Sequence, residues 1–215
     1  MTAEGLDGLL ATAAVDPAVP ELRPDYVALL VAAVNVPGGP SDDVSDGWLR
    51  QAEGAAIGRL AGSPPEERPH VALWREAFRA LGAKPQRTRN SLEALLRRVP
   101  DGLPWINRLS DLYNALSVLH EVPVVEHAQH GEVVWADDAG VTCCRWNWWQ
   151  CRRTQLTPAT TRALFIIDAL GPDALAKASA SGDDLEARLR ALDPAVATAR
   201  RLLTAPRTTK EPRDD

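Results

Sequence analysis

Lysine, methionine and the smaller aromatic residues are scarce in this chain of 215 residues. Only three of its 24 basic residues are lysines, and it has one methionine, two tyrosines and two phenylalanines beside seven tryptophans. Nearly all the positive charge is therefore guanidinium, which suits planar, two-pronged contacts to carboxylate or phosphate. A GC-rich genome also produces abundant arginine, alanine, proline and glycine, and this is the simpler explanation of the composition.

An excess of positive charge, a long apolar run and a cysteine framework are also missing. The 29 acidic residues outnumber the 24 basic ones and give a net charge of -5, which excludes binding to nucleic acid by bulk charge, so any RNA contact must be local. No segment resembles a membrane span or a secretory signal. Three cysteines, two of them adjacent, do not indicate disulfide pairing. We expect a cytoplasmic protein with no membrane association.

The chain is predicted to form a single domain of the α+β class, in which a mixed sheet packs on helices, with helical extensions at both ends. We expect a flexible N-terminal segment over 1–23, the domain over 24–204 and a disordered tail over 205–215. Residues 25–36 are long enough for a helix, although their β-branched content leaves a strand possible. Apolar spacing predicts further helices over 48–60, 71–81 and 91–98, and helical segments between 172 and 203.

A central helix is predicted over residues 106–120, after Pro104. One face carries apolar residues at helical spacing, and a second stripe, formed by Asn107, Asp111 and Asn114, is polar but nearly uncharged. Asparagine and aspartate are poor formers of helix interiors because they compete for backbone hydrogen bonds. The stripe therefore predicts part-buried, hydrogen-bonded side chains, which either line a site or form a structural polar seam.

A β-hairpin is predicted over residues 132–149, with its turn at 137–140, and another strand over 162–168. Alternation along the returning strand of the hairpin places Arg145, Asn147 and Trp149 on one face and Trp146 and Trp148 on the other.

Three segments together resemble the stand-alone B3/B4 domain proteins, which are related to the editing domain of the phenylalanyl-tRNA synthetase beta subunit. They read WREAFRALGAKPQRTRNSLEALLRRV, LPWINRLSDLYNALSVLHEVPV and GEVVWADDAGVTCCRWNWWQCRRTQLTPATTRALFIID, and they span Trp74 to Leu170. The resemblance implies a B3/B4-like fold with a pocket for an amino acid or aminoacyl group. In the synthetase the domain hydrolyses tyrosine mischarged on the phenylalanine tRNA, whereas many stand-alone members have no assigned function.

The chain departs from the family pattern after Pro123. Typical members carry an insertion of strands there, whereas this chain runs PVVEHAQHGEVV and keeps only a few residues of it. The resemblance therefore implies a pocket that lacks part of its wall.

The proposed catalytic residues are polar groups that could position a water and hold a carbonyl, because an aminoacyl ester needs little covalent help. They are Asn107, Asp111, Asn114, Arg145 and Asn147. In the structural alternative, Asn107 caps its helix and Asp111 pairs with an arginine such as Arg145 or Arg153.

The predicted substrate-binding residues are the aromatic and basic side chains that follow. Flat tryptophan surfaces would wall a pocket for an aromatic group, and packing of the hairpin on helices is the alternative. Arg152, Arg153 and Arg162 form a local basic patch for a tRNA acceptor end, with a solvated surface as the alternative. The predicted set is Trp146, Trp148, Trp149, Arg153 and Thr154.

No metal or cofactor is favoured, because the spacing of the histidines and cysteines matches no common metal motif. The alternative is haem or a metal ion held by His127 and His130, which lie in the shortened segment, where a new activity could be built.

Three functions follow from these observations. The first is hydrolysis of mischarged aminoacyl-tRNA in trans, with tRNA as the partner. The second is a repurposed enzyme of specialised metabolism that acts on an amino acid derivative, with haem or iron at His127 and His130. The third is a non-catalytic module that binds an aminoacyl-tRNA or a small amino-acid-derived ligand.

Overall fold

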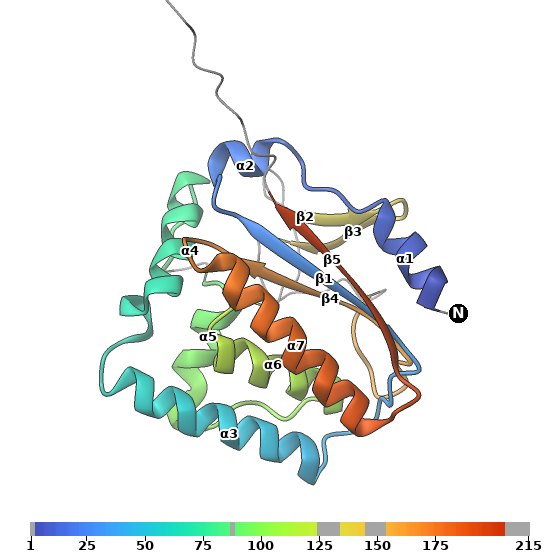
Figure 1. Cartoon of the computed structure of the whole chain (residues 1–215). Coiled ribbons are helices and arrows are strands. Elements are labelled where there is room, and N and C mark those ends of the chain that lie inside the picture. The colour runs from blue at the N-terminus through green and yellow to red at the C-terminus, as the bar shows by residue number, and fades with distance from the viewer. Residues whose placement is uncertain (1–2, 87–88, 124–133, 145–153, 205–215) are drawn as a thin grey trace, which may run out of the picture.

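The computed structural model describes residues 3–86, 89–123, 134–144 and 154–204. Its centre is a three-stranded antiparallel sheet in the order β4-β1-β5, formed by Val27–Val34 (β1), Arg162–Ala169 (β4) and Ala197–Thr204 (β5). A two-stranded antiparallel hairpin of Val134–Asp137 (β2) and Gly140–Cys144 (β3) lies beside it (Figure 1). The α+β class is confirmed, but the described strands are all antiparallel, so the prediction of a mixed sheet is wrong.

The central strand β1 occupies the segment for which a helix over 25–36 is predicted. All eight of its residues are buried, and it pairs with β4 on one edge and β5 on the other. A strand covered on both faces consists of one continuous apolar run, which periodicity alone cannot distinguish from a buried helix. The β-branched residues Val27, Val31 and Val34 favour the extended form.

The last strand, β5, is a second correction, because its sequence ATARRLLT is predicted to be helical. Alanine, arginine and leucine are good helix formers, so local propensity does not indicate a strand here. Pairing with β1 over the full length of both strands, from Val27 opposite Thr204 to Val34 opposite Ala197, overrides that propensity. The predicted C-terminal helical segment is therefore a helix, Ala174–Leu192 (α7), followed by a strand.

Helices cover both faces of the sheet (Figure 1). One core contains Val31, Ile167 and Leu189 and joins the sheet to Arg108–His120 (α6) and α7. Behind α6, a second core joins Asp43–Leu60 (α3) and Ser91–Arg98 (α5). The opposite face of the sheet packs on Pro69–Ala80 (α4). Two short 3-10 helices, Pro65–Glu67 and Val99–Asp101, precede α4 and follow α5.

The N-terminal residues also contribute to the core. A flexible segment is expected over 1–23, but the structure has Ala3–Ala11 (α1) and Ala18–Leu22 (α2) there. Leu6, Leu10 and Val19 are all buried with the second face of the sheet, and Arg201 of β5 donates to the Leu10 carbonyl. The apolar residues of α1 thus close part of the core. The tail over 205–215 lies outside the described residues.

Two glycines on helix interiors give a matched test of this packing. A Cβ added to Gly182 of α7 would lie 2.5 Å from Leu29 Cδ2 of β1, whereas one added to the exposed Gly54 of α3 meets nothing within 4 Å. We expect Gly182→Ala to destabilise the protein by about 1–2 kcal/mol through overpacking. Gly54→Ala should stabilise it by up to about 1 kcal/mol through helix propensity. Urea unfolding measures both, and equal effects of the two variants would contradict the packing of α7 on β1.

Candidate functional site

Asp111, a predicted catalytic residue, is fully buried on α6 and joins two other segments. Its Oδ1 accepts from the Ile106 backbone N–H at 2.9 Å, and its Oδ2 accepts from the Ser45 hydroxyl of α3, also at 2.9 Å. Both carboxylate oxygens are therefore engaged in structural hydrogen bonds. The polar seam predicted as an alternative describes Asp111 well, although its partners are Ser45 and a backbone amide and not an arginine.

The other two members of the stripe differ from each other. Asn107 is the N-cap of α6, where its side chain accepts from the Ser110 N–H at 3.0 Å and donates to the Leu156 carbonyl at 3.3 Å. The predicted helix cap is thus present. Asn114 is buried, with 6% exposure, and within the described part of the chain its side chain has no hydrogen-bond partner.

Most of the remaining predicted residues lie outside the described residues. Thr154 is described and lines the cavity presented next. The others are Arg145, Asn147, Trp146, Trp148, Trp149, Arg153, His127 and His130, so the structure bears on neither the tryptophan cluster nor the histidine alternative. Among the side chains that are described, no three histidine, cysteine, aspartate or glutamate residues come together to hold a metal. Within the same residues no helix is both long and apolar enough to cross a bilayer.

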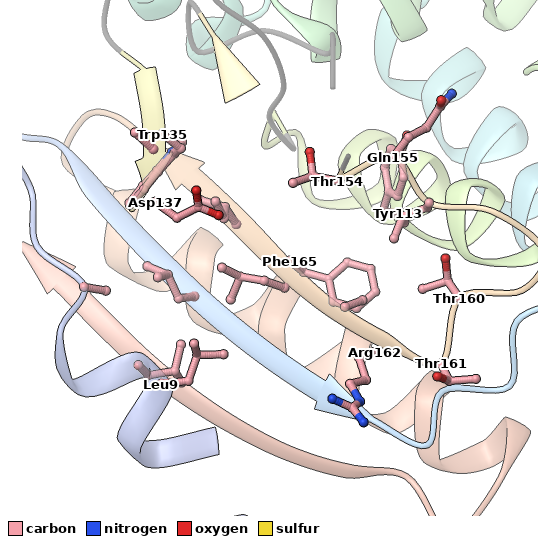
Figure 2. Close-up of a pocket in the computed structure, with 18 of the residues that line it drawn as sticks. Leu9, Tyr113, Trp135, Asp137, Thr154, Gln155, Thr160, Thr161, Arg162 and Phe165 are labelled. Carbon is pink, nitrogen blue, oxygen red and sulfur yellow. The ribbon is translucent and has the colours of Figure 1, made fainter. Parts of the chain in front are cut away.

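A cavity of about 970 Å³ lies around β4, which is an edge strand of the sheet (Figure 2). Residues from both faces of β4 line it: Leu164 and Ile166 on one face, and Ala163 and Phe165 on the other. Its remaining lining comes from α1 and the residues after it, β1, α6, the β2–β3 hairpin and the segment 154–161. The volume falls within the range of small-molecule sites.

Apolar and aromatic side chains and hydroxyls line the cavity. The apolar lining includes Leu30, Ile166 and Trp135 on one face of the sheet and Phe165 on the other, and Trp135 packs against Ile166. Five threonines also line the cavity: Thr12, Thr154, Thr157, Thr160 and Thr161. A mostly apolar wall with a few polar groups is the usual chemistry of a ligand pocket.

Charge is separated along the cavity. Trp135 and Asp137 of the hairpin lie toward the C-terminal end of β4, and Arg162 lies at its start (Figure 2). Asp138, which follows Asp137 in the hairpin, also lines the cavity. Arg162 is exposed, and in the described part of the chain no carboxylate forms an ion pair with it. Asp138 is exposed as well. One end of the cavity thus presents acceptors for a cation and the other a donor for an anion.

A close backbone approach fixes the threonine-containing segment 157–160 of the lining. A Cβ on Gly38 would lie 2.6 Å from the carbonyl oxygens of Pro158 and Thr160, so only glycine fits there. Arg108 of α6 fixes the same loop, because it donates to the Pro37 and Gly38 carbonyls at 3.1 Å and pairs with Asp42 at 2.6 Å. The segment 157–160 therefore rests on the loop that connects β1 to α3.

Two buried titratable residues have strongly shifted pKa values. Asp168 of β4 is fully buried, and this desolvation raises its pKa to about 7, against opposing contributions from the side chains of Tyr26 and Trp135. His70 of α4 is also buried, and desolvation lowers its pKa to about 4. Its Nε2 accepts from the Leu170 N–H at 2.9 Å, so Nδ1 carries the proton and donates to the Glu121 carbonyl. His70 is thus a neutral core histidine.

Comparison with models of known families, with curated proteins and with solved structures finds no match to this chain. The resemblance to B3/B4 domains stays a prediction.

The sequence analysis missed several cavity residues for identifiable reasons. Trp135 is a single tryptophan in a short strand, and nothing in its sequence context distinguishes it as a pocket residue, unlike the cluster of three tryptophans nearby. Tyr113 belongs to the apolar face of the central helix, which was predicted to be buried. In the structure it is only half-buried and lines the cavity. Phe165 lies in a strand predicted correctly, but its exposure to a cavity depends on β4 being an edge strand.

The role of Asp111 is open to a direct test. Asp111→Ala removes the carboxylate that accepts from the Ser45 hydroxyl and from the Ile106 N–H, so we expect a loss of about 2 kcal/mol in the free energy of unfolding. Asp101→Ala, at an exposed position without such bonds, should change stability by less than about 0.5 kcal/mol. An Asp111→Ala protein as stable as the wild type would contradict the structural role.

The two shifted pKa values make opposite contributions to stability. A pKa of about 7 in the folded state means that Asp168 costs stability as pH rises from its ordinary value of 3.8 to about 7. His70, lowered from 6.5 to about 4, adds stability as pH rises over that interval. Asp168→Asn removes only the first contribution. We therefore expect the variant to gain about 2–3 kcal/mol of stability between pH 4 and 6.5, whereas the wild type gains much less. Urea unfolding across this range tests it, and parallel curves for the two proteins would contradict it.

Proposed function

We propose that the cavity around β4 binds an aminoacyl group esterified to a nucleotide, and that the protein hydrolyses mischarged aminoacyl-tRNA in trans. The observation that supports this most directly is the separation of charge along an apolar cavity. An aminoacyl ester of a nucleotide carries an ammonium at its amino-acid end and a phosphate at its nucleotide end. Asp138 suits the ammonium, Trp135 suits an aromatic side chain, and Arg162 suits the phosphate.

The length of the cavity favours such an extended ligand over a free amino acid. Trp135 packs on Ile166, which lies four residues from Arg162 along the same face of β4. At about 3.3 Å per residue these positions are about 13 Å apart. A ligand that reaches both ends must therefore be extended. Threonine hydroxyls of the lining could orient a water for attack on the ester.

A non-catalytic binding module is the second candidate. The described lining residues include no histidine, lysine or glutamate, and the carboxylates among them, Asp137 and Asp138, are assigned here to the ammonium end of the ligand and not to the ester. Full binding of the ligand without release of the amino acid on prolonged incubation would favour this function over hydrolysis.

Two substitutions at opposite ends of the cavity test where the ligand lies. The probes are a non-hydrolysable tyrosyl-adenosine analogue with and without a 5′-phosphate, measured by calorimetry. Arg162→Ala should weaken binding of the phosphorylated analogue by about tenfold and leave the other unchanged, because only the first presents an anion to the arginine. Asp138→Asn should weaken both by about the same factor, because both carry the ammonium.

Matched controls are available on surfaces away from the cavity. Arg50→Ala, at a side chain that is 73% exposed on α3, and Asp101→Asn should leave both affinities unchanged. Equal losses for Arg162→Ala and Arg50→Ala would contradict the placement of the ligand. Release of tyrosine from mischarged phenylalanine tRNA at the buffer rate would contradict the hydrolytic activity.

A further inference from the structure

The edge strand β4 leaves the backbone of alternate residues unpaired along the cavity. In an antiparallel sheet the N–H and C=O of one residue point to the same side of the strand, and those of the next residue point to the other side. The Asp168 N–H donates to the Pro123 carbonyl at 3.4 Å and therefore points away from β1. Leu164 and Ile166 are four and two residues before Asp168, so their N–H and C=O groups also point away from β1, at the outer edge of the sheet.

Ile166 is the residue of this edge at which an unpaired backbone is least expected. Its exposure is 9%, and it lines the cavity. Within residues 3–86, 89–123, 134–144 and 154–204, neither its N–H nor its C=O forms a hydrogen bond. Buried backbone groups are nearly always paired, because an unpaired one costs about as much free energy as a lost hydrogen bond. Ile166 thus offers one donor and one acceptor to a molecule in the cavity.

We propose that the backbone of Ile166 binds the amino-acid end of the ligand as a neighbouring strand would. The inference rests on the proposed function and names the group that holds the main chain of the aminoacyl residue. In an antiparallel hydrogen-bonded pair, two residues exchange both of their N–H···O bonds. An aminoacyl group is one such residue, because its ammonium can donate to the Ile166 carbonyl and its ester carbonyl can accept from the Ile166 N–H.

The charges at the two ends of the cavity give the ligand the direction that this pairing requires. Its ammonium lies toward Asp137 and Asp138 of the hairpin, and its phosphate lies toward Arg162 at the start of β4 (Figure 2). The amino acid therefore runs from its amino to its carboxyl end opposite to β4. Only an antiparallel residue can exchange two hydrogen bonds with a single partner.

The same pairing brings the side chain of the ligand to Trp135. Residues directly opposite each other in an antiparallel pair carry their side chains on the same face of the sheet. Trp135 packs on Ile166, so an amino acid opposite Ile166 extends its side chain to the face on which the indole lies. An aromatic side chain then contacts the indole. The direction, the charges and the aromatic contact agree on one position for the amino acid.

Hydrogen exchange on protein labelled with nitrogen-15 isoleucine tests the pairing in the unaltered chain. The sequence has four isoleucines, so few signals need assignment. Ile167 is the internal control, because it follows Ile166 on β4 and its N–H points to Leu29 of β1. We expect the Ile166 N–H to exchange about tenfold faster than the Ile167 N–H in the free protein. The phosphorylated tyrosyl-adenosine analogue should slow exchange at Ile166 by about tenfold.

An ester in place of the peptide bond before Ile166 removes this N–H and keeps the side chain. We expect this substitution to weaken binding of the analogue by about tenfold in calorimetry. Leu202 is the matched control on the other edge strand. Ala28 lies between Asp168 and Leu203 and bonds to Leu203, so the N–H of Leu202 points outward, and Leu202 does not line the cavity. The same ester at Leu202 should leave the affinity unchanged.

The possible results separate the pairing from the proposed function. An Ile166 N–H that exchanges as slowly as that of Ile167 in the free protein, or an analogue that binds equally well to both esters, overturns the pairing. If Arg162→Ala still weakens binding in that case, the proposed function stands. An analogue that does not bind the wild type overturns both. Slowed exchange at Ile166, with a loss of affinity confined to the Ile166 ester, supports the pairing.

Discussion

The burial of β1 on both faces and its pairing on both edges is the constraint on which the rest of the structure depends. Eight consecutive apolar residues cannot meet water on either side, so helices must cover the sheet above and below. The helices α6 and α7 cover one face, while α1, α2 and α4 share the other. The cavity lies where this cover ends, at the outer edge of β4.

Polar side chains inside the protein connect elements that apolar packing alone would leave free to slide. Asp111 fixes the start of α6 to α3 through Ser45, and Asn107 joins the same helix end to the segment at Leu156. Arg108 holds the loop that follows β1 by donating to the Pro37 and Gly38 carbonyls. These hydrogen bonds from the N-terminal end of α6 therefore fix the segment at Leu156 and the loop after β1 relative to α3 and α6. The stripe on α6 supports a site from behind, and the groups that line the cavity come from other elements.

Helix predictions succeeded where local signals agree with the fold. The segment SLEALLRR has an asparagine cap, an acid in its first turn and arginines in its last, and it is the helix α5. The strand β4 was also predicted, from the apolar run over 162–168. The errors, β1 and β5, are segments whose identity is decided by their partners: β1 by burial on both faces, and β5 by pairing with β1 against its helical propensity.

The site was less predictable, because the cavity forms where the helices leave the edge strand β4 uncovered, and this depends on the packing of the whole chain. Trp135 is distant in the sequence from Phe165 and Arg162, which both lie on β4. They line one cavity because β4 is at the edge of the sheet and Trp135 of the hairpin packs on Ile166. The pattern on α6, by contrast, correctly indicated buried side chains, and hydrogen-bonded ones at Asn107 and Asp111. It could not show that both oxygens of Asp111 are taken up by Ser45 and a backbone amide.

The central claim is that the cavity around β4 is a ligand site for an extended aminoacyl nucleotide. A crystal structure of the protein with the phosphorylated tyrosyl-adenosine analogue tests it most directly. The account predicts the tyrosyl ring against Trp135 and the phosphate at Arg162. An analogue bound on another surface, or a crystal grown with saturating analogue whose cavity is empty, would contradict it.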